Sequence, residues 1–503
     1  MDTITEKMLD QYGVTDETRQ FLAQPFQPMF INGEFVPARS GEQFDVFDPA
    51  TEGQLLAVPS AGIEDVDDAV MAARQAFPEW AAMKPLERQA LLMKLADAME
   101  QHADTLAELE AINAGKALEG CKVVDIQGSI DFIRYMGSWA TKIDGATRTL
   151  SWPGETFGYT LKEPVGVVAA IVPWNWPLNM AIWKLIAPLT VGCTVVIKPA
   201  EITPISLLYL MKIWKEAGLP DGVINVITGF GSVVGAHLVS HPEINKVSFT
   251  GSTPVGKLVG KAALDNMAHI TLELGGKSAM VAFEDADIDD IVAAAHQSVF
   301  FNSGQVCSAG SRLYVHRAIY QQTLDALAAS LQDVVIGDPL QPGVTQGPQI
   351  SANQLESILN YINIGVQEGA RLVYGGNKVD RPGYFVEPTL FADTRNDMRI
   401  VQEEIFGPVL TVAPFDSEAE AVELANDNIY GLAASVFTQD LSRAHRVVKA
   451  LHAGTVCVNT HDALDPALPF GGYKQSGIGK DLGAEQLQHF LETKAVIMQL
   501  KSS

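Results

Sequence analysis

Val167-Val168-Ala169-Ala170-Ile171-Val172 opens a part of the chain in which short β-branched runs alternate with helical segments. The runs that follow are Thr194-Val195-Val196-Ile197, Val223-Ile224-Asn225-Val226-Ile227 and Lys246-Val247-Ser248-Phe249. One intervening helix is expected over 203–218, with Thr203 as its N-cap, Pro204 in its first turn and Gly218 at its end. Strands alternating with helices predict a parallel, doubly wound α/β sheet, whose ligands bind beyond the carboxyl ends of the strands.

Other patterns extend this prediction in both directions along the chain. Asn32-Gly33 between two β-prone runs predicts a hairpin, and apolar spacing predicts helices over 65–80 and from Pro85 onward. A second series of strands and helices begins at 278–283, and 495–498 reads as a final strand. We therefore expect two α/β domains and a small element built from separate segments.

Composition excludes several classes of function. The 503 residues allow roughly three domains, and 35 basic against 60 acidic side chains give a net charge of −25, which repels nucleic acids and anionic lipid surfaces. The most apolar stretch, 165–197, contains prolines, asparagines and Lys184, and so predicts buried core rather than a membrane span. Four cysteines without paired spacing predict neither a disulfide framework nor a metal site.

The first 20 residues carry five acidic side chains against Lys7 and Arg19, unlike a secretory or transit peptide. We therefore expect the protein to be cytoplasmic.

Two glycine-containing turns are candidates for phosphate binding. Gly229-x-Gly231-x-x-x-Gly235 is one residue longer than the usual dinucleotide pattern, and alone it fits an ordinary strand-to-helix turn as well. The second turn, 249–256, follows a strand and opens a helix, so its free backbone N–H groups and the Ser252 hydroxyl would suit a phosphate. Lys198 and Glu201 follow another strand and would either bind ribose hydroxyls or be solvated loop charges.

Three side chains are candidates for covalent chemistry. Cys307 lies in a loop of small residues, 302–312, and is either an inert buried thiol or a nucleophile. Glu273 stands between two leucines, where burying an unpaired carboxylate would be costly, which favours a functional role. Asn175, in Pro173-Trp174-Asn175-Trp176-Pro177, is either a turn residue or an amide donor to an oxyanion.

Seven motifs taken together resemble those of the NAD(P)-dependent aldehyde dehydrogenase superfamily, in this order and over nearly the whole chain. They are Pro-Trp-Asn-Trp-Pro at 173–177, Lys-Pro-Ala-Glu at 198–201, Phe-Thr-Gly-Ser at 249–252, Leu-Glu-Leu-Gly-Gly-Lys at 272–277, Gly-Gln-Val-Cys at 304–307, Glu-Glu-Ile-Phe-Gly-Pro at 403–408 and Pro-Phe-Gly-Gly-Tyr-Lys at 469–474. Any one of them alone would be weak.

The resemblance implies an aldehyde-dehydrogenase-like α/β fold. It places a Rossmann-like NAD-binding domain at 1–142 and 163–275, a catalytic domain at 276–487, and a small β oligomerisation element at 143–162 and 488–503. It also implies a homotetramer or homodimer that acts on a small aldehyde.

The resemblance further implies roles for individual residues. Cys307 would be the nucleophile, Glu273 the base, and Asn175 with the Cys307 backbone N–H the oxyanion hole, with Lys198 in the catalytic set as well as at the ribose. The cofactor would contact Ile171, Pro173, Trp174, Lys198, Glu201, Gly231, Phe249, Gly251, Ser252, Leu274, Glu404 and Phe406. The substrate would contact Trp176, Met180, Trp183, Phe301, Val306, Leu464 and Phe470.

These roles carry further expectations. Desolvation should raise the pKa of Glu273 towards about 6–7. Glu201 should repel the 2′-phosphate of NADP, so NAD is expected as the cofactor. Retention of Glu273 favours hydrolysis over transfer to coenzyme A. One position departs from the pattern: Asp481 stands where relatives commonly have Glu, which puts a proton-relay role there in doubt.

The expected substrate is an uncharged aromatic or medium-chain aldehyde, because the predicted substrate contacts are apolar or aromatic. The stretch 459–474 looks most like that of phenylacetaldehyde dehydrogenases. Betaine aldehyde is an alternative, since tryptophans bind quaternary ammonium groups, and broad aliphatic aldehydes are another. From other functional classes, a catalytically silent structural relative and a thiol esterase stay open.

Overall fold

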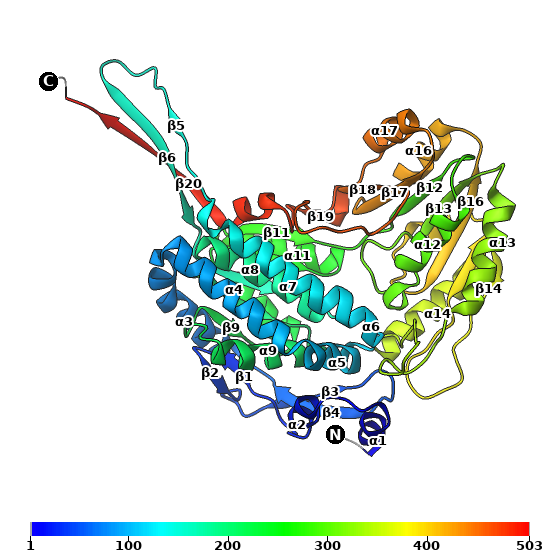
Figure 1. Cartoon of the computed structure of the whole chain (residues 1–503), viewed down its shortest axis with the longest axis horizontal. Coiled ribbons are helices and arrows are strands. Elements are labelled where there is room, and N and C mark those ends of the chain that lie inside the picture. The colour runs from blue at the N-terminus through cyan, green and yellow to red at the C-terminus, as the bar shows by residue number, and fades with distance from the viewer. Residues whose placement is uncertain (1–2, 502–503) are drawn as a thin grey trace.

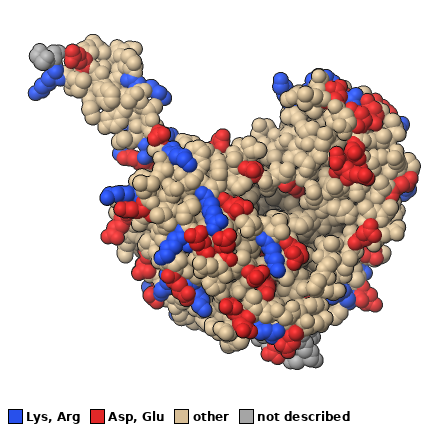
Figure 2. All heavy atoms as spheres, viewed as in Figure 1, with Lys and Arg blue, Asp and Glu red and all other residues tan. Residues whose placement is uncertain are grey.

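The structure, a computed structural model, describes residues 3–501. Two lobes lie side by side, and a narrow β arm extends away from the first lobe (Figure 1). The space-filling view shows a hollow between the lobes, with acidic and basic side chains scattered over the first lobe (Figure 2).

The first lobe is built on an eight-stranded sheet in the order β19-β11-β10-β7-β8-β9-β1-β2. Its five central strands run parallel, as the alternating pattern predicts, and antiparallel strands close both edges. The Asn32-Gly33 hairpin joins the two strands at one edge. The strands are β1 (Met29–Ile31), β2 (Glu34–Val36), β7 (Val167–Ile171), β8 (Thr194–Lys198), β9 (Ile224–Val226), β10 (Lys246–Thr250), β11 (His269–Glu273) and β19 (Gly477–Ile478).

Helices pack on this sheet, and the predicted helices at 65–80 and from Pro85 are among them. The most apolar stretch is core: all of β8 and α8 is buried. No helix within 3–501 is both long and apolar enough to cross a membrane. The helices of this lobe are α1 (Thr3–Tyr12), α2 (Asp16–Leu22), α3 (Ile63–Ala82), α4 (Pro85–Gln101), α5 (Ala103–Ala114), α6 (Leu118–Gly120), the π-helix η1 (Cys121–Gln127), α7 (Gly128–Gly137), η2 (Ser138–Thr141), α8 (Pro177–Val191), α9 (Ile205–Glu216), the π-helix η3 (Gly231–Gly235), α10 (Ala236–Ser240) and α11 (Thr253–Asp265). Beside them, β3 (Gln43–Phe47) and β4 (Gln54–Pro59) form a separate pair.

The predicted N-cap at Thr203 is wrong. The helix begins at Ile205, and the Ile205 N–H donates to the side-chain oxygen of Asn113 on α5 at 3.3 Å. The Thr203 hydroxyl is buried with no hydrogen-bond partner within 3–501. A neighbouring helix therefore supplies the cap that a local pattern assigned to threonine, while Gly218, at φ +95°, ends the helix as predicted.

The second lobe contains a seven-stranded sheet in the order β14-β15-β16-β13-β12-β17-β18, parallel except for β14. The Asp287 side chain caps α12 by accepting from the Asp289 N–H. The strands are β12 (Ala279–Ala282), β13 (Arg312–His316), β14 (Arg371–Tyr374), β15 (Thr389–Ala392), β16 (Val409–Phe415), β17 (Ala433–Phe437) and β18 (Thr455–Val458). The helices are α12 (Ile288–Gln297), η4 (Phe301–Gly304), α13 (Tyr320–Ser330), η5 (Leu331–Asp333), α14 (Ala352–Gln367), α15 (Arg399–Gln402), α16 (Glu418–Asn426), α17 (Leu441–Ala450) and η6 (Lys474–Ser476). The last 3-10 helix, η7 (Ala484–Phe490), packs against α8 of the first lobe.

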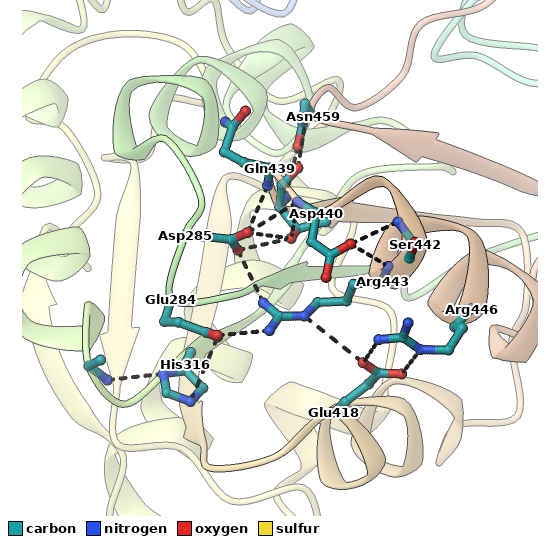
Figure 3. Close-up of polar contacts among 12 residues, drawn as sticks. Glu284, Asp285, His316, Glu418, Gln439, Asp440, Ser442, Arg443, Arg446 and Asn459 are labelled. Carbon is teal, nitrogen blue, oxygen red and sulfur yellow. Dashed lines mark hydrogen bonds and ion pairs between the residues drawn. The ribbon is translucent and has the colours of Figure 1, made fainter.

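An ion-pair network fastens α17 to the end of β12 and to α16 (Figure 3). The Arg443 guanidinium contacts Glu284 at 2.8 Å, Asp285 at 3.2 Å and Glu418 at 3.9 Å. Asp285 also accepts hydrogen bonds from Thr438, so one carboxylate joins three segments. The network lies at the carboxyl end of β12.

The arm is a three-stranded antiparallel sheet in the order β20-β6-β5. It combines β5 (Thr147–Arg148) and β6 (Thr156–Pro164) with β20 (Leu491–Gln499), which pairs with β6 over its whole length. These segments correspond to the small β element expected from 143–162 and 488–503. The expected domain bounds stay a prediction; β19, within 276–487, adds to the first sheet.

Candidate active site

A cavity of about 790 Å³ contains the side chains of both Cys307 and Glu273. Its walls come from α7, α8, η1, the loop before Cys307 and the loop 460–466. The seven side chains expected to contact the substrate all line it: Trp176, Met180, Trp183, Phe301, Val306, Leu464 and Phe470. The fold therefore brings the candidate nucleophile and base to one mostly apolar chamber.

The loop before Cys307 holds an uncommon backbone conformation. Asn302, Ser303 and Gly304 have φ values of +47°, +55° and +73°, so three successive residues lie in the left-handed region. Hydrogen bonds hold the loop in place: Ser303 donates to the Gly347 carbonyl at 2.8 Å, and the Gln305 side-chain oxygen accepts from the Ile350 N–H at 2.9 Å. Conformations of this kind persist only where the surroundings enforce them, and they concentrate at functional sites.

Two glycines after Glu273 allow three segments to meet. A Cβ atom at Gly276 would lie 2.3 Å from the Cys307 carbonyl oxygen, and one at Gly275 would lie 2.1 Å from a carboxylate oxygen of Glu404. Any side chain at either position would push these segments apart. The Leu-Glu-Leu-Gly-Gly motif is therefore a packing requirement that places the candidate base beside the cysteine loop.

The Glu273 carboxylate is buried at the carboxyl end of β11, with 4% of the residue exposed. Neither oxygen makes a full hydrogen bond within residues 3–501, although the Gly472 backbone lies near enough to favour the charged form slightly. Gly471 passes so close that a Cβ atom there would lie 2.4 Å from a Glu273 oxygen. Burial, followed by repulsion from Asp481, raises the pKa of Glu273 well above its usual value, in the expected direction.

A buried ion pair lies next to Glu273. The Lys184 ammonium contacts an oxygen of Asp481 at 2.7 Å, with 0% and 2% of the side chains exposed. The other Asp481 oxygen accepts from the Gln486 amide at 3.0 Å. Asp481 also lines the cavity. Although its side chain is shorter than the Glu common at this position in relatives, it is paired with a buried cation.

The Cys307 thiol is held in its neutral form. Burial raises its pKa far above the usual value, and the negative charges of Asp462, Glu404 and Glu273 add to the effect. Cys307 is partly exposed and lines the cavity. Proton removal from the sulfur is therefore a necessary step in any nucleophilic chemistry here.

Asn175 lies behind the cysteine loop. Its side-chain N–H donates to the Gln305 carbonyl at 2.9 Å, and its own carbonyl accepts from the Asn302 amide at 3.1 Å. An amide nitrogen carries two hydrogens, so one donor is used and one is left for an oxyanion. Asn175 thus positions the loop that carries Cys307, and its role as an oxyanion donor stays a prediction.

The expected adenosine contacts gather at the carboxyl ends of the first sheet, away from the Cys307 cavity. The Lys198 ammonium lies 3.2 Å from Glu201, and the other Glu201 oxygen accepts from the Gly231 N–H at 3.4 Å. Lys198 is not among the residues that line the cavity with Cys307. Of the expected catalytic set, Cys307 and Glu273 line the cavity, and Asn175 does not line it but is hydrogen-bonded to the loop before Cys307. Lys198 lies at the end of β8 in the first sheet.

The remaining cofactor candidates lie on neighbouring segments. Ile171 ends β7, Phe249 lies on β10, and Gly251 donates its N–H to the Glu273 carbonyl at 3.0 Å. Ser252 precedes α11, and its side chain caps no backbone N–H of that helix. Pro173 lies in the turn between β7 and α8, and Leu274 at the end of β11 is buried.

The segment around Glu404 lies between the two lobes. The Trp174 ring meets Phe406 edge-on, with centroids 5.2 Å apart, and Glu404 accepts from the Gly276 N–H at 3.0 Å. Burial raises the pKa of Glu404 to about 7. Together with the uncapped start of α11 and the charged pair Lys198–Glu201, these groups fit a nucleotide with a phosphate at the helix and hydroxyls at either end.

Sequence reasoning missed part of the cavity wall. His461 is buried, with one ring nitrogen 2.8 Å from the Ser308 carbonyl and the other 2.5 Å from the Ser435 hydroxyl. Neighbouring Asp462, at φ +53°, has no hydrogen-bond partner within 3–501 for either carboxylate oxygen. No spacing singles these residues out, because only the fold brings 460–466 next to Cys307. Residues of the first-lobe helices were missed for the same reason: Val123, Val124, Asp131, Phe132 and Asn179.

Asp67, His237 and His241 form a separate cluster on the first lobe, with ligand-capable atoms within 4.8 Å of one another. The His237 ring lies 2.7 Å from Asp67. His241 accepts the Glu243 N–H at Nδ1, which leaves the proton on Nε2, the atom that faces Asp67 at 3.5 Å. The cluster is therefore built as a hydrogen-bonded pairing of α3 with α10.

Comparison with known proteins agrees with this geometry. The profile described as "Aldehyde dehydrogenase family" matches residues 35–496. This chain belongs to the aldehyde dehydrogenase family. A structure from Bacillus cereus, described as an NAD+ complex of aldehyde dehydrogenase, superposes with a TM-score of 0.95 at 47% identity, covering 97% of this chain and 99% of that one.

Two curated relatives in the family act on aromatic aldehydes, according to their names. A mitochondrial benzaldehyde dehydrogenase from Antirrhinum majus is 45% identical, covering 95% of this chain and 90% of that protein. A phenylacetaldehyde dehydrogenase from Pseudomonas fluorescens is also 45% identical, covering 93% of this chain and 95% of that protein. The expected family and the two-lobed α/β fold are thus confirmed.

Proposed function

We propose that this aldehyde dehydrogenase oxidises an uncharged aromatic aldehyde, of the size of phenylacetaldehyde, to its carboxylic acid with NAD. The observation that carries the proposal is the shared cavity: Cys307 and Glu273 face one chamber whose other walls are mainly aromatic and apolar. A nucleophile and a base that face the same chamber suit acyl transfer at the carbonyl carbon of a bound substrate.

The Cys307 sulfur adds to the aldehyde carbon to form a thiohemiacetal. Because the resting thiol is neutral, its proton passes to solvent water in the chamber as the carbon–sulfur bond forms. The negative oxygen is held by the second Asn175 N–H and the Cys307 backbone N–H. Lys198, Glu201, Glu404 and the start of α11 would hold NAD, which would supply the acceptor for the hydride that leaves the substrate carbon.

Glu273 acts in the second half of the reaction. A carboxylate with a raised pKa is a stronger base than an exposed one, and here it takes a proton from the water that hydrolyses the Cys307 thioester. The released product is an acid, and the carboxylates along the cavity repel it. Within the pair Lys184–Asp481, the Lys184 ammonium lowers the pKa of Glu273, and the Asp481 carboxylate raises it more strongly.

The chamber supports the proposed substrate by its shape and charge. Trp176 stacks with Phe301, with centroids 5.9 Å apart and planes inclined by 28°, and Trp183 meets Phe470 edge-on. No lysine or arginine is among the residues that line the chamber. Aldehydes that carry a carboxylate or a phosphate would therefore find no counter-charge. Both aromatic relatives are equally similar to this chain, so identity does not choose between their substrates.

Betaine aldehyde is a second candidate, favoured by one observation. Asp131, Asp462 and Asp465 line the same chamber without a basic side chain among its walls, which suits a cationic substrate beside the tryptophans. We rank it below the aromatic aldehydes because apolar and aromatic side chains make up most of the chamber lining.

The cofactor preference, the assembly and the location complete the proposal. Attraction to Lys198 lowers the pKa of Glu201 although burial acts in the opposite sense, so Glu201 is an anion that opposes a 2′-phosphate. The β arm is proposed to assemble two or four copies, because Trp152, Phe157, Leu161 and Ile497 leave 66%, 43%, 40% and 66% of their area exposed there. The cytoplasmic location stays a prediction.

The proposal is tested by NADH formation with phenylacetaldehyde, benzaldehyde, betaine aldehyde and hexanal. We expect kcat/KM to be highest for the first two. Cys307→Ala should abolish turnover, whereas Glu273→Gln should give one burst of NADH and then stall. A thiol esterase would instead hydrolyse esters without any aldehyde-dependent NADH, and a silent relative would do neither. A maximum for hexanal would refute the aromatic substrate.

A further inference from the structure

A buried charged layer lies directly behind the substrate chamber, and the proposed chemistry does not use it. Lys116 is 4% exposed, Asp125 is fully buried and Glu110 is 1% exposed. Lysine is rarely buried to this extent unless it is paired, so its placement calls for a function.

The backbone turns Lys116 inward. Gly115 ends α5 at φ +73°, and a Cβ atom there would lie 2.8 Å from Pro348 and 2.9 Å from Pro49, so only glycine fits this turn. The Lys116 ammonium then contacts Asp125 at 2.5 Å and lies over the Trp176 ring, 3.6 Å from its centroid.

The π-helix η1 gives Asp125 its position. Its wide turn places Val123 and Val124 on the chamber wall, while Asp125 points the other way into the protein. The Ser129 hydroxyl donates to the Asp125 carbonyl, which fixes the end of the π-helix. Single π-turns of this kind often occur at functional sites.

The charge of Lys116 is balanced by Asp125, the carboxylate that it contacts directly. Burial, with repulsion from Asp125, raises the pKa of the neighbouring Glu110 to about 8, which keeps it neutral at pH 7. Glu110 accepts hydrogen bonds from the Ser206 hydroxyl and from the Leu178 N–H at the start of α8. The layer therefore holds both Trp176 and the helix that begins after it.

We propose that Lys116 is a positioning residue that sets substrate preference: its ammonium, anchored by Asp125, fixes the Trp176 ring, so that Trp176 and Phe301 form a flat wall for a planar aldehyde. The inference rests on the proposed function for the identity of the aldehyde. A cation held over an indole in a buried site is among the stronger contacts of its kind. An aliphatic chain needs no flat wall and should respond little.

The test compares three variants with the wild type on phenylacetaldehyde and on hexanal. Lys116→Met removes the charge and keeps the length, and Lys116→Met with Asp125→Asn also restores charge balance. Lys116→Arg keeps a cation over the ring. We expect both Met variants to raise KM for phenylacetaldehyde about tenfold, with kcat, KM for NAD and KM for hexanal within about twofold, and Arg to restore most of the loss.

A second measurement follows the ring itself. The near-ultraviolet circular dichroism of the wild type minus that of Trp176→Phe gives the Trp176 signal, and the same difference in the Lys116→Met background should be much weaker. Proteins with loosened aromatic packing lose this signal. The measurement needs no substrate, so it stands even if the wild type oxidises no aromatic aldehyde, a result that would refute only the proposed function.

Several outcomes would overturn the inference. Equal increases in KM for both aldehydes, or recovery in the charge-balanced double variant, would mean that Lys116 only neutralises Asp125. An unchanged KM with an unchanged Trp176 signal would mean that the contact has no effect on the wall. If Lys116→Met does not fold, the double variant carries the same comparison, because it buries no unpaired carboxylate.

Discussion

The α-carbon of Gly276 lies against the carbonyl group of Cys307, so closely that a Cβ atom would come within 2.3 Å of the oxygen. This contact sets the distance between the segment that carries the base and the loop that carries the nucleophile. The left-handed residues Asn302 and Ser303 have no freedom to absorb a shift, because hydrogen bonds fix the loop on its other side.

Gly276→Ala should therefore displace the Cys307 loop and lower kcat by at least about tenfold, since a misplacement of about 1 Å can cost 10²-fold. Steady-state NADH formation measures this change in kcat. Gly260→Ala is the matched control, because a Cβ atom there meets Leu272 at 3.4 Å, an ordinary contact. Equal activity of the two variants would contradict the proposed packing role.

Asp481→Asn should lower the pKa of Glu273. The negative charge of Asp481 raises that pKa, and its removal leaves Lys184 as an uncompensated positive charge. The acid limb of the kcat–pH profile should thus move to lower pH when hydrolysis limits the rate. The unpaired Lys184 should also cost about 3–5 kcal/mol of stability.

Asp465→Asn serves as the control for that profile. Asp465 lies at the exposed edge of the chamber. Its substitution removes one negative charge and leaves the contact between Lys184 and Asp481 intact. Its acid limb should stay where the wild type has it. A limb that moves to higher pH in Asp481→Asn would show that the sign of the interaction is wrong.

Glu201→Gln should relax the preference for NAD. The carboxylate, kept ionised by Lys198, opposes the 2′-phosphate of NADP, and the amide does not. We expect the ratio of kcat/KM for NAD over NADP to fall about tenfold or more, as one charge contact of about 1.4 kcal/mol changes affinity tenfold. Glu216→Gln, on the exposed end of α9, should leave the ratio unchanged.

Arg443→Met should weaken the second lobe most clearly above pH 4. Contacts with Arg443 and neighbouring donors lower the pKa values of Glu284 and Asp285, so their stabilisation is present above their unfolded pKa values and is lost as pH falls through the folded ones. We expect the free energy of unfolding to fall by about 1 kcal/mol near pH 7 and by less towards pH 3. Thermal unfolding of the variant and the wild type at each pH measures this difference.

Arg446→Met is the comparison for that experiment. Arg446 contacts only Glu418 in the same network, and 56% of its side chain is exposed against 20% for Arg443. Its removal should change the unfolding temperature less than that of Arg443 at every pH. The reverse order would mean that the network contributes little as a unit.

The sequence predicts the parallel strands β7, β8, β9 and β10 well, because each lies within a continuous β-branched run between turn residues. It predicts Glu273 and Cys307 as chemical groups for similarly local reasons: a carboxylate among leucines and a thiol among glycines. The cap of α9 could not be predicted, because Asn113 reaches it from a helix about 90 residues earlier. Lys116 and Asp462 are invisible for the same reason, since their surroundings come from distant segments.

The crossing segment that contains β19 has a mechanical consequence. Its backbone pairs with β11 opposite Glu273, while the Tyr473 N–H is bonded to Gly431 in the second lobe. It thus tethers both lobes at the level of the base. A hinge opening wide enough to separate Glu273 from Cys307 would have to break the pairing of β19 with β11. We therefore expect nucleotide exchange to use movements that keep Glu273 and Cys307 together.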